Sequence, residues 1–190
     1  MCVIKIFNKP TDLIFGFDDL VKFHGTNSIC GLTVSFKVME AAWKEIWSVS
    51  PPRREDLSVV SGFPGPGTRD GFEMVTRAVS RDTYRVIPDA KPGPLVSEAA
   101  KGAYFFQLCD DKQIIELGLK PGMLPEDFIP RRRAMARGEA SSSDVKEFRK
   151  IQFSFSSAAP NASRSWRISS LGAMRALMDA ISSRLAMTSG

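Results

Sequence analysis

The chain has 190 residues, 43% of them hydrophobic and 25% charged, with a formal net charge of +5, which predicts one globular domain with an extension. The positive charge is modest, and its excess at residues 160–190, four arginines against one acid, is weaker than the dense basic patch of a nucleic-acid-binding protein, so we do not expect a nucleic-acid partner. The sequence has no apolar stretch of about 18 residues and no CxxC pair, which excludes a membrane span and a zinc ribbon within the chain, and its three unpatterned cysteines predict a cytoplasmic protein.

The first part of the chain mixes helices and strands. Apolar periodicity and turn residues predict, in order, a strand at 2–7, helices at 17–23 and 32–47, a strand at 56–63, a glycine-rich turn at 62–71 and a helix at 72–80. The clearest of these is the helix from Leu32 to Trp47, because its apolar residues recur at steps of three and four.

The second part predicts three strands and then helices. The expected elements are strands at 83–87, 103–109 and 113–117, a loop at 89–94, helices at 125–137 and 144–155, a linker at 154–165 and a last helix with an apolar stripe. Residues 110–112 predict a hairpin turn, and Asp144 is the expected N-cap of its helix. The run from Arg131 to Arg133 is interpreted as a solvated helix face.

This order of elements predicts an α+β fold, with a mixed or antiparallel sheet packed by helices. We expect a core at residues 1–157, followed at 158–190 by a linker and a C-terminal amphipathic helix from Trp166 onward. The apolar stripe of that helix consists of Leu171, Met174, Met178, Ile181 and Leu185.

The only histidine, His24, and one of the three cysteines, Cys30, lie immediately before the long helix. Imidazole nitrogen and thiolate both bind Zn²⁺ and related ions, and they can also form a base–nucleophile pair. The N-terminus of the following helix would lower the pKa of the thiol. We therefore predict His24 and Cys30 as metal ligands, and the candidates for a third ligand are Asp18, Asp19, Asp70 and Cys109. Alternatively, His24 caps a turn and Cys30 is a small buried residue.

The glycine-rich turn is the second candidate site. It lies between a strand and a helix, where backbone N–H groups can face an anion. Thr68, Arg69 and Asp70 are the predicted cofactor-binding residues, with Arg69 as the counter-charge of a carboxylate or phosphate. The alternative is a stiff turn in which Thr68 or Asp70 caps the next helix.

Two stretches resemble the FmdE family, which takes its name from formylmethanofuran dehydrogenase. Phe23-His24-Gly25, followed by Cys30 and Gly31-Leu32 at the head of a helix, is similar to the family pattern His-Gly-His-x-Cys-Pro-Gly. The stretch from Arg137 to Phe148 is similar to the family's glycine turn and acid-rich helix with Glu-Phe. The similar region covers residues 15–155.

The resemblance implies an α+β core, a homodimer, and a cavity at the His/Cys loop that holds zinc or another transition-metal ion. His24 matches the first family histidine, and Asp70 is the candidate for the family's aspartate near the next strand–helix junction. The chain resembles a divergent member: Thr26 stands at the second histidine, Cys30 follows His24 by six residues instead of four, and no cysteine follows Cys109 to build the C-terminal zinc finger.

The sequence leaves three functions open. The leading interpretation is an FmdE-like protein of unassigned reaction that binds a transition metal or a small ligand at the His/Cys loop. The alternative is a non-enzymatic accessory or assembly subunit that docks a protein partner, or closes a homodimer, through the C-terminal helix. The third is a cofactor-phosphate binder that uses residues 65–71.

Overall fold

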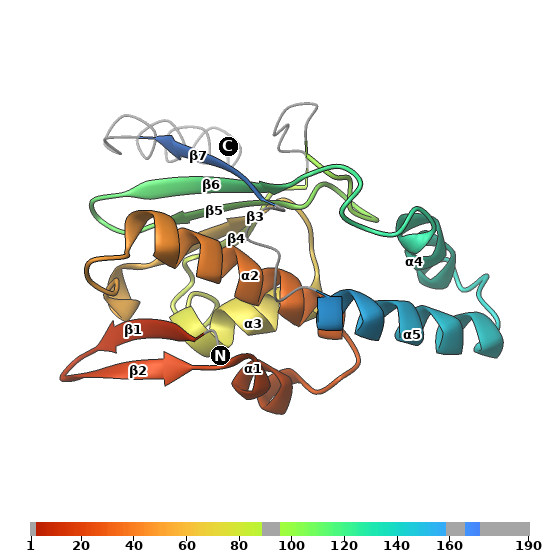
Figure 1. Cartoon of the computed structure of the whole chain (residues 1–190), viewed down its shortest axis with the longest axis horizontal. Coiled ribbons are helices and arrows are strands. Elements are labelled where there is room, and N and C mark those ends of the chain that lie inside the picture. Colours follow the sequence, from red (N-terminus) through yellow and green to blue (C-terminus); the bar gives the residue numbers. More distant parts are fainter. Residues whose placement is uncertain (1–2, 89–95, 159–165, 172–190) are drawn as a thin grey trace, which may run out of the picture.

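The computed structural model describes residues 3–88, 96–158 and 166–171, and these form an α+β fold (Figure 1). Its elements, in chain order, are β1 (Ile4–Asn8), β2 (Thr11–Phe15), α1 (Phe17–His24), α2 (Ile29–Ile46), a 3-10 turn (Arg54–Asp56), β3 (Ser58–Ser61), α3 (Pro66–Thr76), β4 (Tyr84–Val86), β5 (Phe105–Cys109), β6 (Ile114–Leu119), α4 (Phe128–Ala136), α5 (Ser142–Ala158) and β7 (Trp166–Leu171). The α+β prediction is confirmed.

The main sheet is mixed, which is one of the two forms predicted. Its strand order is β4-β3-β5-β6-β7, with β3 and β4 parallel and the other pairs antiparallel. The hairpin predicted between β5 and β6 is confirmed. Asp110 forms its turn, because its Oδ1 accepts hydrogen bonds from the backbone N–H groups of Lys112 at 2.9 Å and Gln113 at 2.7 Å.

The helices α2 and α3 form a layer between the main sheet and a small N-terminal sheet (Figure 1). The side chains that fill the space between α2, α3 and the main sheet are fully buried and alternate along the strands: Phe106, Leu108, Ile115 and Leu117. Phe72 joins α3 to this sheet, with its ring centroid 5.7 Å from that of Phe106. Burial of one face of the sheet under two helices is thus what orders the core.

The small sheet pairs β1 with β2 in antiparallel register, from Ile4 opposite Phe15 to Asn8 opposite Thr11. The sequence predicts β1 but not β2, because the segment from Thr11 to Phe15 is short and begins with two polar residues. Pairing with β1 stabilises β2 as a strand, although the sequence pattern of β2 alone does not predict one.

The start of α3 differs from the prediction of a glycine-rich turn at 62–71. Residues 66–71 are already helical, and the N-cap is Gly65 instead of Thr68 or Asp70. Pro66 favours this early start, because proline at the first helical position has a suitable φ and lacks an N–H that would be unpaired there anyway. The helix ends at Thr76, before the predicted Ser80, with Arg77 in the left-handed conformation at φ 57°.

The cap of α5 also differs from the prediction. The backbone N–H of Asp144 donates to Ser141 Oγ at 3.2 Å, and Asp144 Oδ2 accepts from the backbone N–H of Ser141 at 2.9 Å. Asp144 therefore closes a capping box that begins at Ser141. The helix continues to Ala158, so the linker predicted from Ser154 is wrong over its first five residues.

The C-terminal part holds a further correction. Residues 166–171, expected in the last helix, form β7 and pair with β6 from Trp166 opposite Leu119 to Leu171 opposite Ile114. Trp166 and Ile168 favour a strand, and the unpaired edge of β6 offers a partner. The rest of the predicted helix, the loop at 89–94 and residues 159–165 of the linker lie outside the described residues. The division at residue 157 stays a prediction.

None of the helices in the described ranges has the combination of length and hydropathy needed to cross a membrane.

Candidate functional site

The N-terminal ends of α2 and α3 lie against each other because two glycines allow the close approach. A Cβ atom at Gly67 would lie 2.5 Å from the carbonyl oxygen of Ser28, and one at Gly31 would lie 2.9 Å from the backbone nitrogen of Thr68. Both obstacles are backbone atoms, which cannot rotate away. The first turns of two helices are thereby held side by side at one end of the core.

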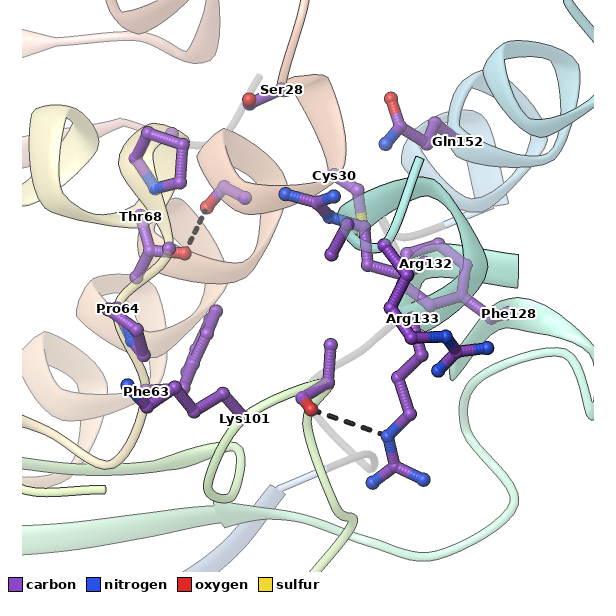
Figure 2. Close-up of a pocket in the computed structure, with 17 residues that line it drawn as sticks. Ser28, Cys30, Phe63, Pro64, Thr68, Lys101, Phe128, Arg132, Arg133 and Gln152 are labelled. Atoms are coloured by element: carbon purple, nitrogen blue, oxygen red, sulfur yellow. Dashed lines mark hydrogen bonds between the residues drawn. The ribbon is translucent and has the colours of Figure 1, made fainter. Parts of the chain in front are cut away.

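A cleft of about 450 Å³ opens beside these helix ends (Figure 2). We call it the basic cleft. It is lined by residues of α2, α3, α4, α5 and the neighbouring loops: Ser28, Cys30, Gly31, Phe63, Pro64, Gly65, Pro66, Gly67, Thr68, Ala100, Lys101, Phe128, Arg132, Arg133, Ala136, Arg137 and Gln152. Figure 2 shows Thr68 and Lys101 across the opening from Arg132 and Arg133. The helix α4 thus forms a wall opposite α3.

The charges on the lining are all positive. Its four basic side chains are Lys101, Arg132, Arg133 and Arg137, and none of the described residues that line the cleft is Asp or Glu. Arg133 is held in place by Glu98 at 3.1 Å and by the carbonyl oxygen of Ala100 at 3.3 Å. Within the described ranges, neither Lys101 nor Arg132 has an ion-pair partner. These two cations remain available to an anion.

The helix ends add to this positive potential. Ser28, the N-cap of α2, and Gly65, the N-cap of α3, make no side-chain capping bond. The first N–H groups of a helix have no partner within it, and the helix dipole places partial positive charge at the same end. Both features favour an anion in the basic cleft.

The other walls are apolar. Phe63 and Pro64 face the opening on one side, and Phe128 lies on the other (Figure 2). Both rings are fixed by aromatic neighbours, with centroid distances of 4.6 Å from Phe63 to Tyr104 and 5.0 Å from Phe128 to Phe148. The cleft therefore combines an anion-attracting part with rigid apolar surface.

Cys30 lines the basic cleft but is only 4% exposed, packed in a small cluster with Phe128 and Phe148. Burial raises the pKa of the Cys30 thiol to about 12. The predicted lowering of the thiol pKa by the helix N-terminus is therefore wrong, because burial disfavours the charged thiolate. At neutral pH the side chain is a thiol.

The structure joins His24 to Asp70 instead. His24 Nδ1 lies 2.7 Å from Asp70 Oδ2, and Arg69 Nη1 donates to Asp70 Oδ1 at 3.1 Å. Three predicted site residues thus form one cluster between α1 and α3. His24 does not line the basic cleft, whereas Thr68 does, with its hydroxyl donating to the carbonyl oxygen of Gly31 at 3.3 Å.

The described residues do not assemble a ligand set for a metal ion. No group of three or more His, Cys, Asp or Glu side chains in these ranges has a suitable arrangement. Of the candidates for a third ligand, Asp19 accepts from the backbone N–H of Gly16 at 2.9 Å, and Cys109 is buried in β5. Zinc ligation by His24 and Cys30 stays a prediction without a third protein ligand.

Arg132 and Arg133 are site residues that the sequence interpretation missed. The run from Arg131 to Arg133 was the available signal, but its three members have different surroundings. Arg131 pairs with Asp127 at 2.6 Å, while the next two arginines line the basic cleft. The helix period alone does not tell which side of α4 faces α3 across the cleft.

Comparisons with known proteins do not assign this chain to a family. No protein-family model matches this sequence, and no curated protein is similar to it. The FmdE resemblance, the homodimer and the cytoplasmic location therefore stay predictions.

Proposed function

We propose that this protein binds a small anionic molecule, with a carboxylate or phosphate group and an apolar part, in the basic cleft. The observation that supports this most is the lining: its described residues include four basic side chains and no acidic one, and it lies at the N-termini of two helices without side-chain caps. The sequence interpretation offered a transition metal or a small ligand at the head of α2, and the small ligand is the choice made here.

The size of the cleft favours a small molecule. Its volume of about 450 Å³ lies in the range of about 300–1,000 Å³ that is usual for small-molecule and cofactor sites. A macromolecular anion would need a longer basic surface than the cleft provides.

Different walls of the cleft bind the anionic group and the apolar part of the molecule. Arg132 and Lys101 neutralise the anionic group, and the helix N-termini supply N–H donors and a favourable dipole. Phe63 and Phe128 cover the apolar part of the molecule. Arg133, already paired with Glu98, adds positive potential and holds α4 to the loop at Ala100.

Two pairs of probes test this function in the full-length protein: AMP against adenosine, and benzoate against benzamide. We expect the anion of at least one pair to bind in titration calorimetry and to raise the melting temperature, while its neutral counterpart does neither. The Arg132→Ala substitution should then weaken that binding by about tenfold or more, because a hydrogen bond to a charged group is lost.

Arg131→Ala is the matched control, since it removes the neighbouring guanidinium, which pairs with Asp127 outside the cleft. Equal loss of binding in both variants would show that only the general charge of α4 matters. Absence of binding by both anions, with the protein folded, would contradict the proposal for these ligand classes.

Metal binding is tested separately. The resemblance predicts a near-stoichiometric transition-metal ion that His24→Ala removes, and elemental analysis of the purified full-length protein measures it. A metal-free wild type would end this part of the FmdE interpretation without touching the basic cleft.

A further inference from the structure

Two cations of the basic cleft have no ion-pair partner within the described ranges, and they lie on opposite walls. Lys101 belongs to the loop before β5, on the same side as Thr68 at the start of α3, and Arg132 belongs to α4 (Figure 2). Both residues are exposed, so a ligand can reach each of them from solvent. The cleft therefore offers an anion two separate points of attachment.

The other two cations of the lining already have partners. Arg133 pairs with Glu98 at 3.1 Å, and the Arg137 guanidinium donates to both carboxylate oxygens of Glu139, at 2.6 and 2.7 Å. None of the described lining residues is acidic, so none of them neutralises the two cations that are left. Two positive charges remain for the ligand, one on each wall.

A single anionic group does not satisfy both of these charges. A carboxylate or phosphate group is only a few atoms across and fills a small part of a cleft of about 450 Å³. If it binds to Arg132, Lys101 stays unmatched, and the rest of the ligand removes water from that cation without replacing it. A ligand with a second anionic group avoids this cost.

We propose that the ligand of the basic cleft carries an anionic group at each end, one bound by Arg132 and the other by Lys101 at the start of α3. The guanidinium can hold a carboxylate or phosphate through two parallel hydrogen bonds, and the lysine ammonium acts as a point charge beside the helix N-terminus. The apolar side chains of Phe63, Pro64 and Phe128 suit the part that joins the two groups. This inference rests on the proposed function and narrows its ligands to molecules with two anionic groups and an apolar or aromatic centre.

Two pairs of probes test the number of anionic groups: terephthalate against benzoate, and adenosine 3′,5′-bisphosphate against AMP. Titration calorimetry of the full-length protein at constant ionic strength measures the affinity of both members of each pair. In at least one pair we expect the member with two groups to bind at least about tenfold more tightly, because it adds a second charge-assisted contact.

Two isomers separate the position of the charges from their number. Phthalate carries the two carboxylates of terephthalate on adjacent ring atoms, and ADP carries both phosphates at one end of the nucleoside. In the pair that shows the preference, we expect the isomer with adjacent groups to bind less tightly than the one whose groups are apart. Equal binding of the two isomers would overturn the inference, because the total charge would then explain the affinity.

Substitutions test the two walls separately. Lys101→Ala and Arg132→Ala should each remove the preference, so that ligands with one and two groups bind with affinities within about twofold of each other, because only one wall still holds an unmatched cation. Arg131→Ala is the control and should keep the preference, since Arg131 pairs with Asp127 outside the cleft.

Equal affinity of the two members in both pairs would overturn this inference and leave the proposed function intact. A preference that survives both Lys101→Ala and Arg132→Ala would also overturn it, because the second group would then bind elsewhere. If no probe of either pair binds to the folded protein, the proposed function fails as well.

Discussion

At the scale of the residue, a single carboxylate closes the C-terminal end of α3. Glu73 accepts hydrogen bonds from the backbone N–H groups of Val79 at 2.8 Å and Ser80 at 3.1 Å, and from the Ser80 hydroxyl. Burial would raise the pKa of Glu73, but these hydrogen bonds, helped by Arg77, outweigh it and lower the pKa below its ordinary value. The turn that follows α3 therefore depends on an ionised side chain.

We expect Glu73→Gln to lower the free energy of unfolding at pH 7 by about 1–3 kcal/mol, because the amide replaces a charged acceptor of three hydrogen bonds. Since the folded-state pKa is lowered, the wild-type advantage is present above the ordinary value of 4.5 and is lost as the pH falls below it. Urea unfolding at pH 7 and at pH 3.5 measures both effects.

The control is Glu139→Gln, which alters an exposed carboxylate paired with Arg137. It should change stability little, as surface ion pairs contribute little. A difference between Glu73→Gln and the wild type that stays constant with pH would contradict the assignment to ionised Glu73.

At the scale of the element, α4 and α5 are held to the molecule by a small core of their own. Its buried members are Cys30, Phe128 and Phe148, separate from the large cluster under the sheet. Polar contacts accompany it: Thr33 Oγ1 donates to Ser156 Oγ at 2.7 Å, and Arg133 of α4 donates to Glu98 and to the carbonyl oxygen of Ala100. The wall of the basic cleft that carries the arginines therefore rests mainly on this small core, and we expect its local stability to depend on it.

We expect Phe148→Ala to release α4 and α5 locally, because it removes an aromatic side chain that is 2% exposed. Hydrogen exchange should become faster in these two helices and stay unchanged in β5 and β6. Phe153→Ala in the same helix is the control, since Phe153 is 47% exposed. Acceleration throughout the protein would show that the small core is part of one cooperative unit.

At the scale of the whole molecule, stability comes from the layer that α2 and α3 form between two sheets (Figure 1). Phe72 is central to it: the side chain is fully buried, and its ring lies 5.7 Å from that of Phe106 and 6.3 Å from that of Tyr84. Its contacts cross from α3 to two strands of the main sheet, so losing them affects helix and sheet together.

We expect Phe72→Ala to lower the free energy of unfolding by about 3–5 kcal/mol, the usual range for a buried phenylalanine. Far-UV circular dichroism and tryptophan fluorescence should report the same lower melting temperature. Phe23→Ala, which removes a 47% exposed ring, should leave the melting temperature nearly unchanged. Stability close to the wild type in Phe72→Ala would contradict this view of the core.

Elements with a local cause could be predicted from the amino-acid order. The apolar repeat of α2, the first turn of α1 with its two aspartates, and the Asp110 turn between β5 and β6 each follow from neighbouring residues, and each is present. The succession of these elements was also enough to predict an α+β fold with a mixed or antiparallel sheet, and the sheet is mixed.

Features that depend on residues far apart in the chain became visible only in the folded protein. The strand β7 forms because the edge of β6 is open to it, and burial by Phe128 and Phe148 keeps Cys30 a neutral thiol. The basic cleft exists because glycines let α2 and α3 touch while α4 turns two arginines toward them. These features depend on packing between residues that are far apart in the chain, and a local sequence pattern cannot predict such packing.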